Sequence, residues 1–240
     1  MLFRSLNDLL SRLDAAIERE RSFVADASHE LRTPLATLRT ELELALRRPR
    51  SAEELRRAIT SAAEETERLT RLADDLLLIA RADQGQLALR TSAVDVPELF
   101  TRALRGLSIP AGRHLSADCD GVRSVHADSH RVEQALRNLV DNAMRHGGGA
   151  VSLAAVAIPG GVELHVRDHG AGFPAGFVAH AFERFSRADG ARTARGAGLG
   201  LSIVQAVALA HGGSATAANA SGGGADVWLT LPSSRPTRPD

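Results

Sequence analysis

The first third of the chain is built on a helical pattern. Apolar residues recur there at steps of three and four, and glycine is absent before Gly85. This spacing predicts long amphipathic helices whose apolar stripes form a seam of the coiled-coil or bundle kind. The first stripe comprises Leu6, Leu10, Leu13, Ile17, Val24, Ala27, Leu31, Leu35, Leu38, Leu42 and Ala45. The second comprises Leu55, Ile59, Ala62, Leu69, Leu72, Leu76 and Ile79.

Local signals mark the ends of these two helices. Residues 47–50 interrupt the pattern, and residues 51–54 read Ser-Ala-Glu-Glu, a capping box that predicts the start of the second helix. Gly85 predicts its end. Two helices joined by a short turn form a hairpin whose single apolar face needs a partner. The simplest partner is a second copy, which would complete a dimeric four-helix bundle.

The rest of the chain mixes short alternating segments with helical ones. Strands are expected near Val94 and at 115–119, 124–127, 150–157, 161–167, 214–219 and 226–231. Helices are expected at 97–107, 129–145 and 199–210. Mixed strands with helices on one face predict an α/β sandwich, so the fold class is a helical hairpin followed by such a domain. Residues 233–240, mostly Pro, Ser and Arg, are expected to form a frayed, disordered tail.

Composition narrows the chemistry that the chain can perform. It has 240 residues, of which 44% are hydrophobic, so global disorder is excluded. Twenty-nine basic residues balance twenty-nine acidic ones, so the chain has no net positive charge that would favour binding of nucleic acid. Cys119 is the only cysteine, which excludes a disulfide framework and a thiolate metal cluster. The sequence contains no Lys, so phosphate would be bound by Arg, backbone N–H groups or a metal.

His29 is the first residue with candidate chemistry. At about 100° per residue it lies roughly 160° from Leu31 around the helix, which points it to solvent, and Thr33 lies one turn further on the same face. Imidazole titrates near pH 6.5, so it is a nucleophile at neutral pH, and Glu30 could accept its second proton. Pro34 removes one N–H, but the seam resumes after it, so a kink is expected rather than a break.

The stretch 23–35 resembles the H-box of sensor histidine kinases of two-component systems. A lone exposed His on an amphipathic helix would need no function, but the match extends over the whole stretch. The resemblance implies that His29 accepts the phosphoryl group and that Glu30 assists proton transfer. It also implies that Thr33 takes part in dephosphorylating the partner.

A second motif places two amides on one helix face. Asn138 and Asn142 are four residues apart, and amide oxygens suit a Mg²⁺ ion that keeps waters and binds phosphates. Residues 137–146 resemble the N-box of the same family, which implies that Asn142 coordinates Mg²⁺ and Asn138 supports the metal–phosphate geometry. Arg145 stands where the family usually has Lys, and His146 replaces the following aromatic residue.

Glycine-rich segments complete the motif set. Asp168 begins an Asp-x-Gly-x-Gly segment after a strand, and its carboxylate could accept a hydrogen bond from the adenine amine. This segment resembles the G1 box, residues 182–187 the F-box and 196–201 the G2 box, which opens a helix towards phosphates. Residues 221–226 resemble the last glycine box in degenerate form, and as a hairpin turn they would need no function.

The segment between Gly172 and Gly196 is too long for an ordinary connection and is rich in Arg. Its composition is typical of a lid over a nucleotide, with one or two of Arg187, Arg192 and Arg195 touching phosphate. The resemblance therefore implies this set of nucleotide-binding residues: Asn138, Asn142, Arg145, Asp168, Gly170, Gly172, Arg187, Arg192, Gly196, Gly198, Leu199 and Gly200.

Taken together, the resemblance implies an ATP- and Mg²⁺-dependent protein histidine kinase. It would phosphorylate His29, pass the phosphoryl group to an Asp of a response regulator receiver domain, and dephosphorylate that regulator. The implied organisation is a HAMP-type linker end at 1–22, a homodimerising phosphotransfer domain at 23–85 and a catalytic domain at 91–232. A longer natural protein would carry an N-terminal membrane sensor, with this portion cytoplasmic.

Two other functions fit these residues less well. ATP hydrolases of the same sandwich fold, the chaperone and topoisomerase relatives that this chain resembles, carry a Glu in place of Asn138 to activate water, and an amide has no such basicity. A non-catalytic dimeric scaffold would be expected to lack His29, Asn142 or Asp168, and all three are present.

Overall fold

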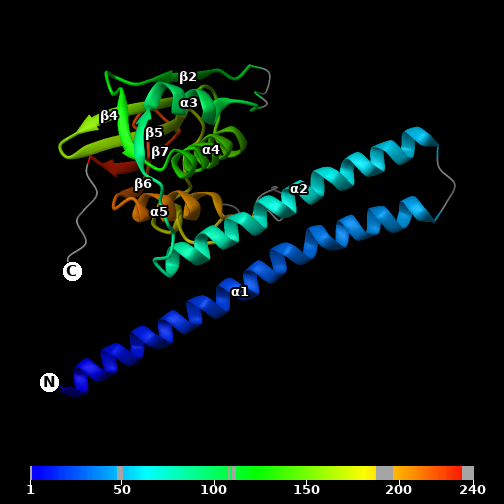
Figure 1. Ribbon diagram of the computed structural model, residues 1–240, viewed down its shortest axis with the longest axis horizontal. Helices are drawn as coiled ribbons and strands as arrows, with labels where there is room; N and C mark the ends of the chain where they lie inside the picture. Colours follow the sequence, from blue (N-terminus) through cyan, green and yellow to red (C-terminus); the bar gives the residue numbers. More distant parts are fainter. Residues whose placement is uncertain (1, 48–50, 108, 110–111, 188–196, 234–240) are drawn as a thin grey trace. The chain divides into compact units, whose positions relative to one another are not determined.

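The computed structural model describes residues 2–47, 51–107, 109, 112–187 and 197–233 (Figure 1). Contacts within the chain divide it into two compact units, residues 1–76 and 77–240. The predicted helical hairpin and the predicted α/β domain are both present, in that order. In the part of the chain that is described, no helix is long and apolar enough to cross a membrane.

The first unit is a hairpin of two long helices, α1 (Leu2–Leu46) and α2 (Ala52–Asp83). The chain remains helical through Pro34, so the prediction that this proline does not end the helix is confirmed. Ser61 of α2 donates a hydrogen bond to Glu41 of α1 at 3.0 Å. Apolar side chains of the predicted seam remain exposed in the single chain, including Leu10, Leu13, Ile17, Val24, Leu35, Leu42, Leu55 and Ile59.

Both predicted ends of α2 have the expected geometry. The backbone N–H of Ser51 donates to Glu54 Oε2 at 2.8 Å, and the N–H of Glu54 donates to Ser51 Oγ at 3.2 Å, which forms the reciprocal capping box. Gly85 has φ of +64°, and the next N–H donates back to the carbonyl of Arg81 at 2.8 Å. This is a Schellman stop, which satisfies carbonyl groups that the helix leaves unpaired.

The second unit contains the remaining elements. Its strands are β1 (Ser92–Asp95), β2 (Leu115–Asp118), β3 (Ser124–Ala127), β4 (Val151–Ile158), β5 (Gly161–Asp168), β6 (Ser214–Asn219) and β7 (Ala225–Pro232). Its helices are α3 (Val96–Leu104), α4 (Ser129–His146), the 3₁₀ helix η1 (Phe177–His180) and α5 (Gly200–Ala210). The helix predicted to reach Leu107 ends earlier, because Arg105 is extended and Gly106 has φ of +77°.

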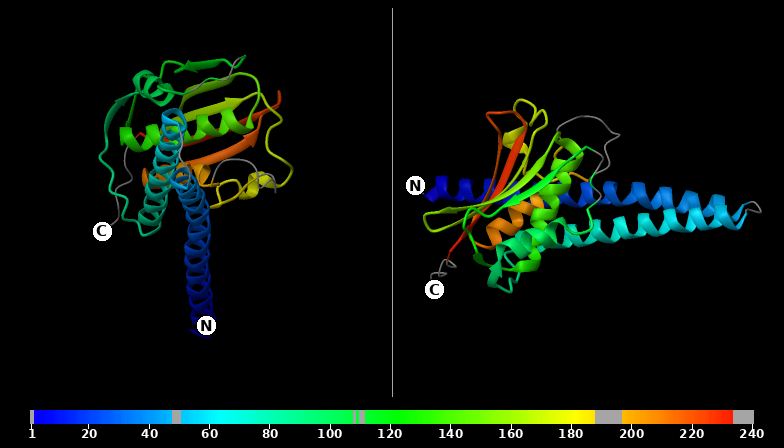
Figure 2. Two further views of the ribbon diagram at one scale, coloured as in Figure 1. Left: turned by 90° about the vertical axis from the view of Figure 1, so that its right-hand side faces the viewer. Right: turned by 90° about the horizontal axis from the view of Figure 1, so that it is seen from above.

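The main sheet has the order β2-β4-β5-β7-β6, and only the β2–β4 pair is parallel. β1 and β3 form a separate antiparallel pair. Helices α4 and α5 lie against one face of the main sheet (Figure 2), and that face supplies the buried positions of the central strands. Leu164 of β5 and Leu229 of β7 are paired across this face and are fully buried.

The last turns of α2 belong to the second unit. Leu78 and Ile79 are 3% and 2% exposed, which makes them part of its core. Asp83, the last residue of α2, pairs with the guanidinium of Arg184 in the F-box-like segment. The end of the long helix is thus attached to the α/β domain by both apolar packing and an ion pair.

Candidate nucleotide site and phosphoacceptor helix

The position of α4 in the second unit is set at its N-terminus. Asp128 is its N-cap and accepts hydrogen bonds from the N–H groups of His130 and Arg131, both at 3.1 Å. The N–H of Arg90 donates to the same carboxylate at 2.8 Å. Burial acts to raise the pKa of Asp128, but these N–H donors and nearby positive charge outweigh it and lower the pKa below its usual value.

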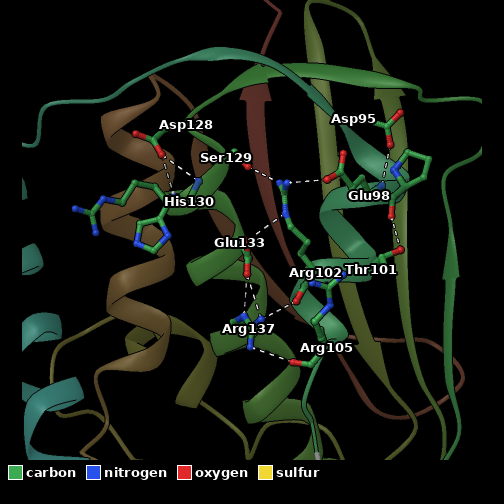
Figure 3. Close-up of polar contacts among 12 residues, drawn as sticks. Asp95, Glu98, Thr101, Arg102, Arg105, Asp128, Ser129, His130, Glu133 and Arg137 are labelled. Carbon is green, nitrogen blue, oxygen red and sulfur yellow. Dashed lines mark hydrogen bonds and ion pairs between the residues drawn. The ribbon is translucent and has the colours of Figure 1, made fainter. Parts of the chain in front are cut away.

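Polar contacts also hold α4 against α3 (Figure 3). Glu133 of α4 pairs with Arg102 of α3 at 3.3 Å and with Arg137 on its own helix at 3.1 Å. The Arg137 guanidinium donates to the carbonyl of Arg102 at 2.7 Å and to that of Arg105 at 3.3 Å, which satisfies the C-terminal end of α3. These bonds attach α4 to the end of α3.

The two predicted amides, Asn138 and Asn142, occupy a half-buried strip of α4. The neighbouring face of the helix packs into the core through Val132, Ala135, Leu136, Leu139, Val140 and Ala143. Nδ2 of Asn138 is buried and has no hydrogen-bond partner among the described residues. A buried donor left without a partner costs free energy, so this atom is suited to meet a bound ligand.

The start of α5 approaches the same strip of α4. A Cβ placed on Gly200 would lie 3.9 Å from Cβ of Asn138. The N-cap residue of α5, Leu199, is 3% exposed and provides no side-chain cap. The first N–H groups of the helix are therefore available to an anion, and the helix dipole favours negative charge there. The residues present thus fit a phosphate group beside Asn138.

Asp168 lies at the end of β5, next to the end of α4. It is 4% exposed, and its Oδ1 accepts a hydrogen bond from the N–H of Gly170 at 2.7 Å. A Cβ on Gly147 would lie 2.4 Å from Cγ of Asp168, and one on Gly170 would lie 2.5 Å from the nitrogen of Gly148. Only glycine fits these positions, so the predicted G1 segment and the residues after the N-box segment pack directly on each other.

The last glycine box takes part in this packing. Ala220 and Gly224 close the turn between β6 and β7 with a hydrogen bond of 2.9 Å. A Cβ on Gly224 would lie 1.9 Å from the carbonyl oxygen of Asp168. As a hairpin turn this box would need no function, but the structure shows that its glycine also supports the backbone of Asp168.

The remaining predicted nucleotide residues surround this centre. Gly198 has φ of +69°, and a Cβ there would lie 2.7 Å from the carbonyl carbon of Phe185, so the G2 and F-box segments are in contact. Arg145 is exposed and lies 3.9 Å from Asp141, and Arg187 is exposed as well. Arg192, Gly196 and the rest of the expected lid at 188–195 lie outside the described residues, as does the expected tail at 234–240.

The donor set suits Mg²⁺ in one particular way. No group of three or more His, Cys, Asp or Glu side chains that could hold a metal occurs in the described part of the chain. A metal here would be held by the amide oxygen of Asn142 together with phosphate oxygens and water. That is the manner in which Mg²⁺ usually binds beside a nucleotide.

The helix that carries His29, α1, belongs to the first unit. His29 and Thr33 are both exposed, as the helical pattern predicts, and Thr33 Oγ1 donates to the carbonyl oxygen of His29 at 3.3 Å. Glu30 is half-buried. The imidazole is therefore accessible to a reactant, with a carboxylate beside it in the sequence and a hydroxyl one turn away on the same face.

Fold and site together define a nucleotide-binding α/β sandwich preceded by a helical hairpin that presents an exposed histidine. A family model described as histidine kinase-, DNA gyrase B-, and HSP90-like ATPase matches residues 127–235. A model described as His Kinase A (phospho-acceptor) domain matches residues 19–85. The chain belongs to the sensor histidine kinase family.

Individual relatives agree with this assignment. A probable sensor histidine kinase of Mycobacterium tuberculosis is 41% identical over 85% of this chain and 54% of the relative. The structure of full-length ShkA in complex with AMPPNP is 31% identical, covering 89% of this chain and 46% of that one, with a TM-score of 0.67. The mycobacterial sensor histidine kinase MprB is 30% identical over 59% of this chain and 97% of that one, with a TM-score of 0.51. The chain spans about half the length of the first curated relatives.

Proposed function

We propose that this chain is the kinase portion of a sensor histidine kinase, which transfers the γ-phosphoryl group of ATP to His29. The observation that carries the proposal is the convergence of three predicted segments in the second unit. Asn138 lies beside Gly200, and Asp168 packs against the end of α4, with an unpartnered buried amide at the centre. Among the relatives, ShkA was crystallised with AMPPNP, an ATP analogue, which supports a nucleotide ligand.

Each residue of the site has a role in this proposal. The buried carboxylate of Asp168 accepts a hydrogen bond from the adenine amine, and the N–H groups at the start of α5 bind phosphate. Asn142 holds Mg²⁺ through its amide oxygen, and Asn138 donates from its unpartnered nitrogen to the phosphates. Arg145 and Arg187 add positive charge. When bound, Mg²⁺ neutralises charge on the transferring and leaving phosphate oxygens.

The chemical step uses the imidazole of His29 as the nucleophile. One ring nitrogen forms a bond to the γ-phosphorus, the bond between that phosphorus and the β–γ bridging oxygen breaks, and ADP leaves. The proton released from the other ring nitrogen passes to the carboxylate of Glu30. An Asp carboxylate oxygen of a response regulator then forms a bond to that phosphorus and the N–P bond breaks, because the imidazole of His29 is a good leaving group. Thr33 would serve the reverse function, by aligning water for dephosphorylation of the regulator.

The exposed seam of the hairpin supports a homodimer. Leu35, Leu42 and Ile59 are 52%, 43% and 66% exposed in the single chain, and burial of such side chains in a four-helix bundle is favourable. We propose residues 23–85 as the dimerising phosphotransfer domain and 91–232 as the catalytic domain. Residues before 23 continue the same helix, α1, and we propose that they form the end of a linker to further segments.

Hydrolysis of ATP by the chain alone is a weaker candidate, because the amide of Asn138 cannot act as a general base. Labelling distinguishes the two functions. After incubation with γ-labelled ATP and Mg²⁺, we expect the protein to carry covalently bound label. Acid treatment should remove this label and alkali should not, as phosphohistidine requires. Release of labelled phosphate without labelled protein would instead indicate a hydrolase.

A further inference from the structure

Arg113, in the segment before β2, contacts the end of α4. Its guanidinium donates hydrogen bonds to four carbonyl oxygens: Met144 at 2.7 Å, Gly149 at 3.0 Å, Ala143 at 3.1 Å and Gly147 at 3.3 Å. None of the sequence motifs includes this arginine, and it contributes nothing to the proposed reaction directly. Its side chain spans the last turn of the helix and the loop that follows.

The chemistry of a helix end explains why an arginine suits this position. The last carbonyl groups of a helix have no partner within it and carry partial negative charge. A guanidinium is planar, always charged and has five N–H donors in a fixed arrangement, so it can satisfy several carbonyls at once. Lysine has a single ammonium group and cannot reach four carbonyls in that manner. The contacts of Arg113 therefore fix geometry as well as charge.

The segment that Arg113 fixes lies between two parts of the nucleotide site. Asn142 directly precedes Ala143, the first of the four carbonyl residues. At the other end, Gly147 abuts the side chain of Asp168, and the carbonyl of the next residue accepts a hydrogen bond from the N–H of His169 at 2.9 Å. One guanidinium thus joins the residue after the proposed metal ligand to the loop that packs against the proposed adenine-binding carboxylate.

We infer that Arg113 is a positioning residue for nucleotide binding, an inference that rests on the proposed function. It sets the distance between Asn142 on α4 and Asp168 at the end of β5, and it touches neither the nucleotide nor the metal. Loss of its contacts allows the last turn of α4 and the loop 147–149 to relax independently. The metal ligand and the adenine-binding group then no longer match the length of one nucleotide.

The test is calorimetric titration of the full chain with ADP and Mg²⁺, comparing the parent with Arg113→Gln and Arg113→Lys. Arg102→Gln is the matched control, because Arg102 is a partly buried arginine of α3 whose guanidinium contacts Ser129 and Glu133 of α4. We expect both Arg113 variants to bind ADP at least about tenfold more weakly, a typical cost of losing a positioning contact beside a metal site. Arg102→Gln should bind like the parent.

Two further measurements separate positioning from stability. The unfolding temperature, followed by the fluorescence of Trp228, should be lower than the parent's in Arg113→Gln. In Arg113→Lys it should return towards the parent's value, because lysine keeps the positive charge at the helix end. ADP affinity should not recover in that variant. The preference for ADP over GDP should also narrow in both Arg113 variants, since it depends on the placement of Asp168, whereas a change in stability alone would leave the preference intact.

The possible results are distinct. Parent-like ADP affinity in the folded Arg113 variants overturns the positioning role and leaves the proposed function standing. Equal loss of affinity in Arg102→Gln and Arg113→Gln overturns it as well, because the effect would then be general destabilisation. Failure of the parent chain to bind ADP overturns the proposed function itself, and the role of Arg113 with it.

Discussion

The backbone N–H of Asp128 donates a hydrogen bond to Nε2 of the buried His211 at 2.9 Å, which joins the beginning of α4 to the end of α5. Nδ1 of the same ring lies 2.8 Å from the carbonyl oxygen of Val207, so the neutral ring donates there and accepts at Nε2. These two helices carry the amides and the phosphate-facing N–H groups of the proposed site. One neutral imidazole therefore connects the two helices that carry the proposed site.

This contact predicts a loss of stability in mild acid. Burial lowers the pKa of His211 below its ordinary 6.5, against smaller opposing effects of the Val207 carbonyl and the Asp128 charge. Above pH 6.5 the ring is neutral in both folded and unfolded chains. As the pH falls below that value, the unfolded chain takes up a proton that the folded chain does not, so the free energy of unfolding decreases until the folded-state pKa is passed.

The measurement is urea unfolding of the second unit, followed by Trp228 fluorescence at several pH values between about 7.5 and about 5.5. His211→Gln keeps an acceptor near the Asp128 N–H but cannot titrate, so its stability should depend less on pH in this range. His165 titrates in the opposite sense. Burial acts to lower the pKa of His165, but Asp226 and Glu163 raise it overall. The protonated ring therefore stabilises the folded chain at low pH, and this contribution is lost as the pH rises above 6.5 through the raised pKa. An unchanged pH dependence in His211→Gln would contradict the prediction.

Asn142→Ala should weaken binding of nucleotide in a manner that depends on Mg²⁺. The substitution removes the amide oxygen proposed to hold the metal, so a higher Mg²⁺ concentration should reduce the defect by mass action. Gln134→Ala is the control, because Gln134 lies two turns earlier on α4 and bonds Arg131 at 3.1 Å. A loss of ADP affinity that is the same at all Mg²⁺ concentrations would show that Asn142 is not a metal ligand.

Asp168→Asn should impair binding by a different route. The amide can still accept from the N–H of Gly170, so the fold should be kept. The charge-assisted hydrogen bond to adenine is lost, which predicts a decrease in affinity of about 10- to 150-fold, or about 1.5–3 kcal/mol. Discrimination between ADP and GDP should relax at the same time. If competitive titration showed that Asp168→Asn still prefers ADP over GDP as strongly as the parent does, Asp168 would have no role in adenine recognition.

Local signals made much of the fold predictable. The capping box of Ser51 and Glu54 and the stop at Gly85 formed as expected, because both depend only on residues close in the sequence. The strands β4, β5 and β7 were predictable because alternating positions along each of them are buried. The end of α3 was placed too late, since leucine at 107 extended the apparent pattern past Gly106. The short helix η1 carries no periodic signal and was not predicted.

The contacts that hold the candidate site together could not be predicted from the sequence. Asn138, Asp168 and Gly200 could be named from local motifs, although nothing local shows that they converge. The contact of Gly224 with the backbone of Asp168, the four carbonyl bonds of Arg113 and the contact of His211 with Asp128 join residues far apart in the chain. Their sequence neighbourhoods contain no pattern that marks them. Tertiary packing alone decides these contacts.

Thr33→Ala separates the forward and reverse functions of the proposed phosphoacceptor helix. The hydroxyl is not needed to make the imidazole nucleophilic, so self-phosphorylation and transfer should stay close to those of the parent. Dephosphorylation of a response regulator should slow, which is read as a longer lifetime of the regulator phosphate with excess kinase and ADP. Thr37→Ala is a matched control, because Thr37 makes the same kind of bond, to the Thr33 carbonyl at 3.2 Å. A parent-like lifetime with Thr33→Ala would leave the hydroxyl without this role.

The central claim is that His29 receives the phosphoryl group, and label incorporation into His29→Gln tests it most directly. The parent, His29→Gln and the control His126→Gln, which alters an exposed histidine of β3, are incubated with γ-labelled ATP and Mg²⁺. ADP affinity should be equal in all three, because His29 belongs to the first unit and the nucleotide site to the second. The parent and His126→Gln should become labelled and His29→Gln should not. Labelling of His29→Gln at the parent's rate would contradict the account.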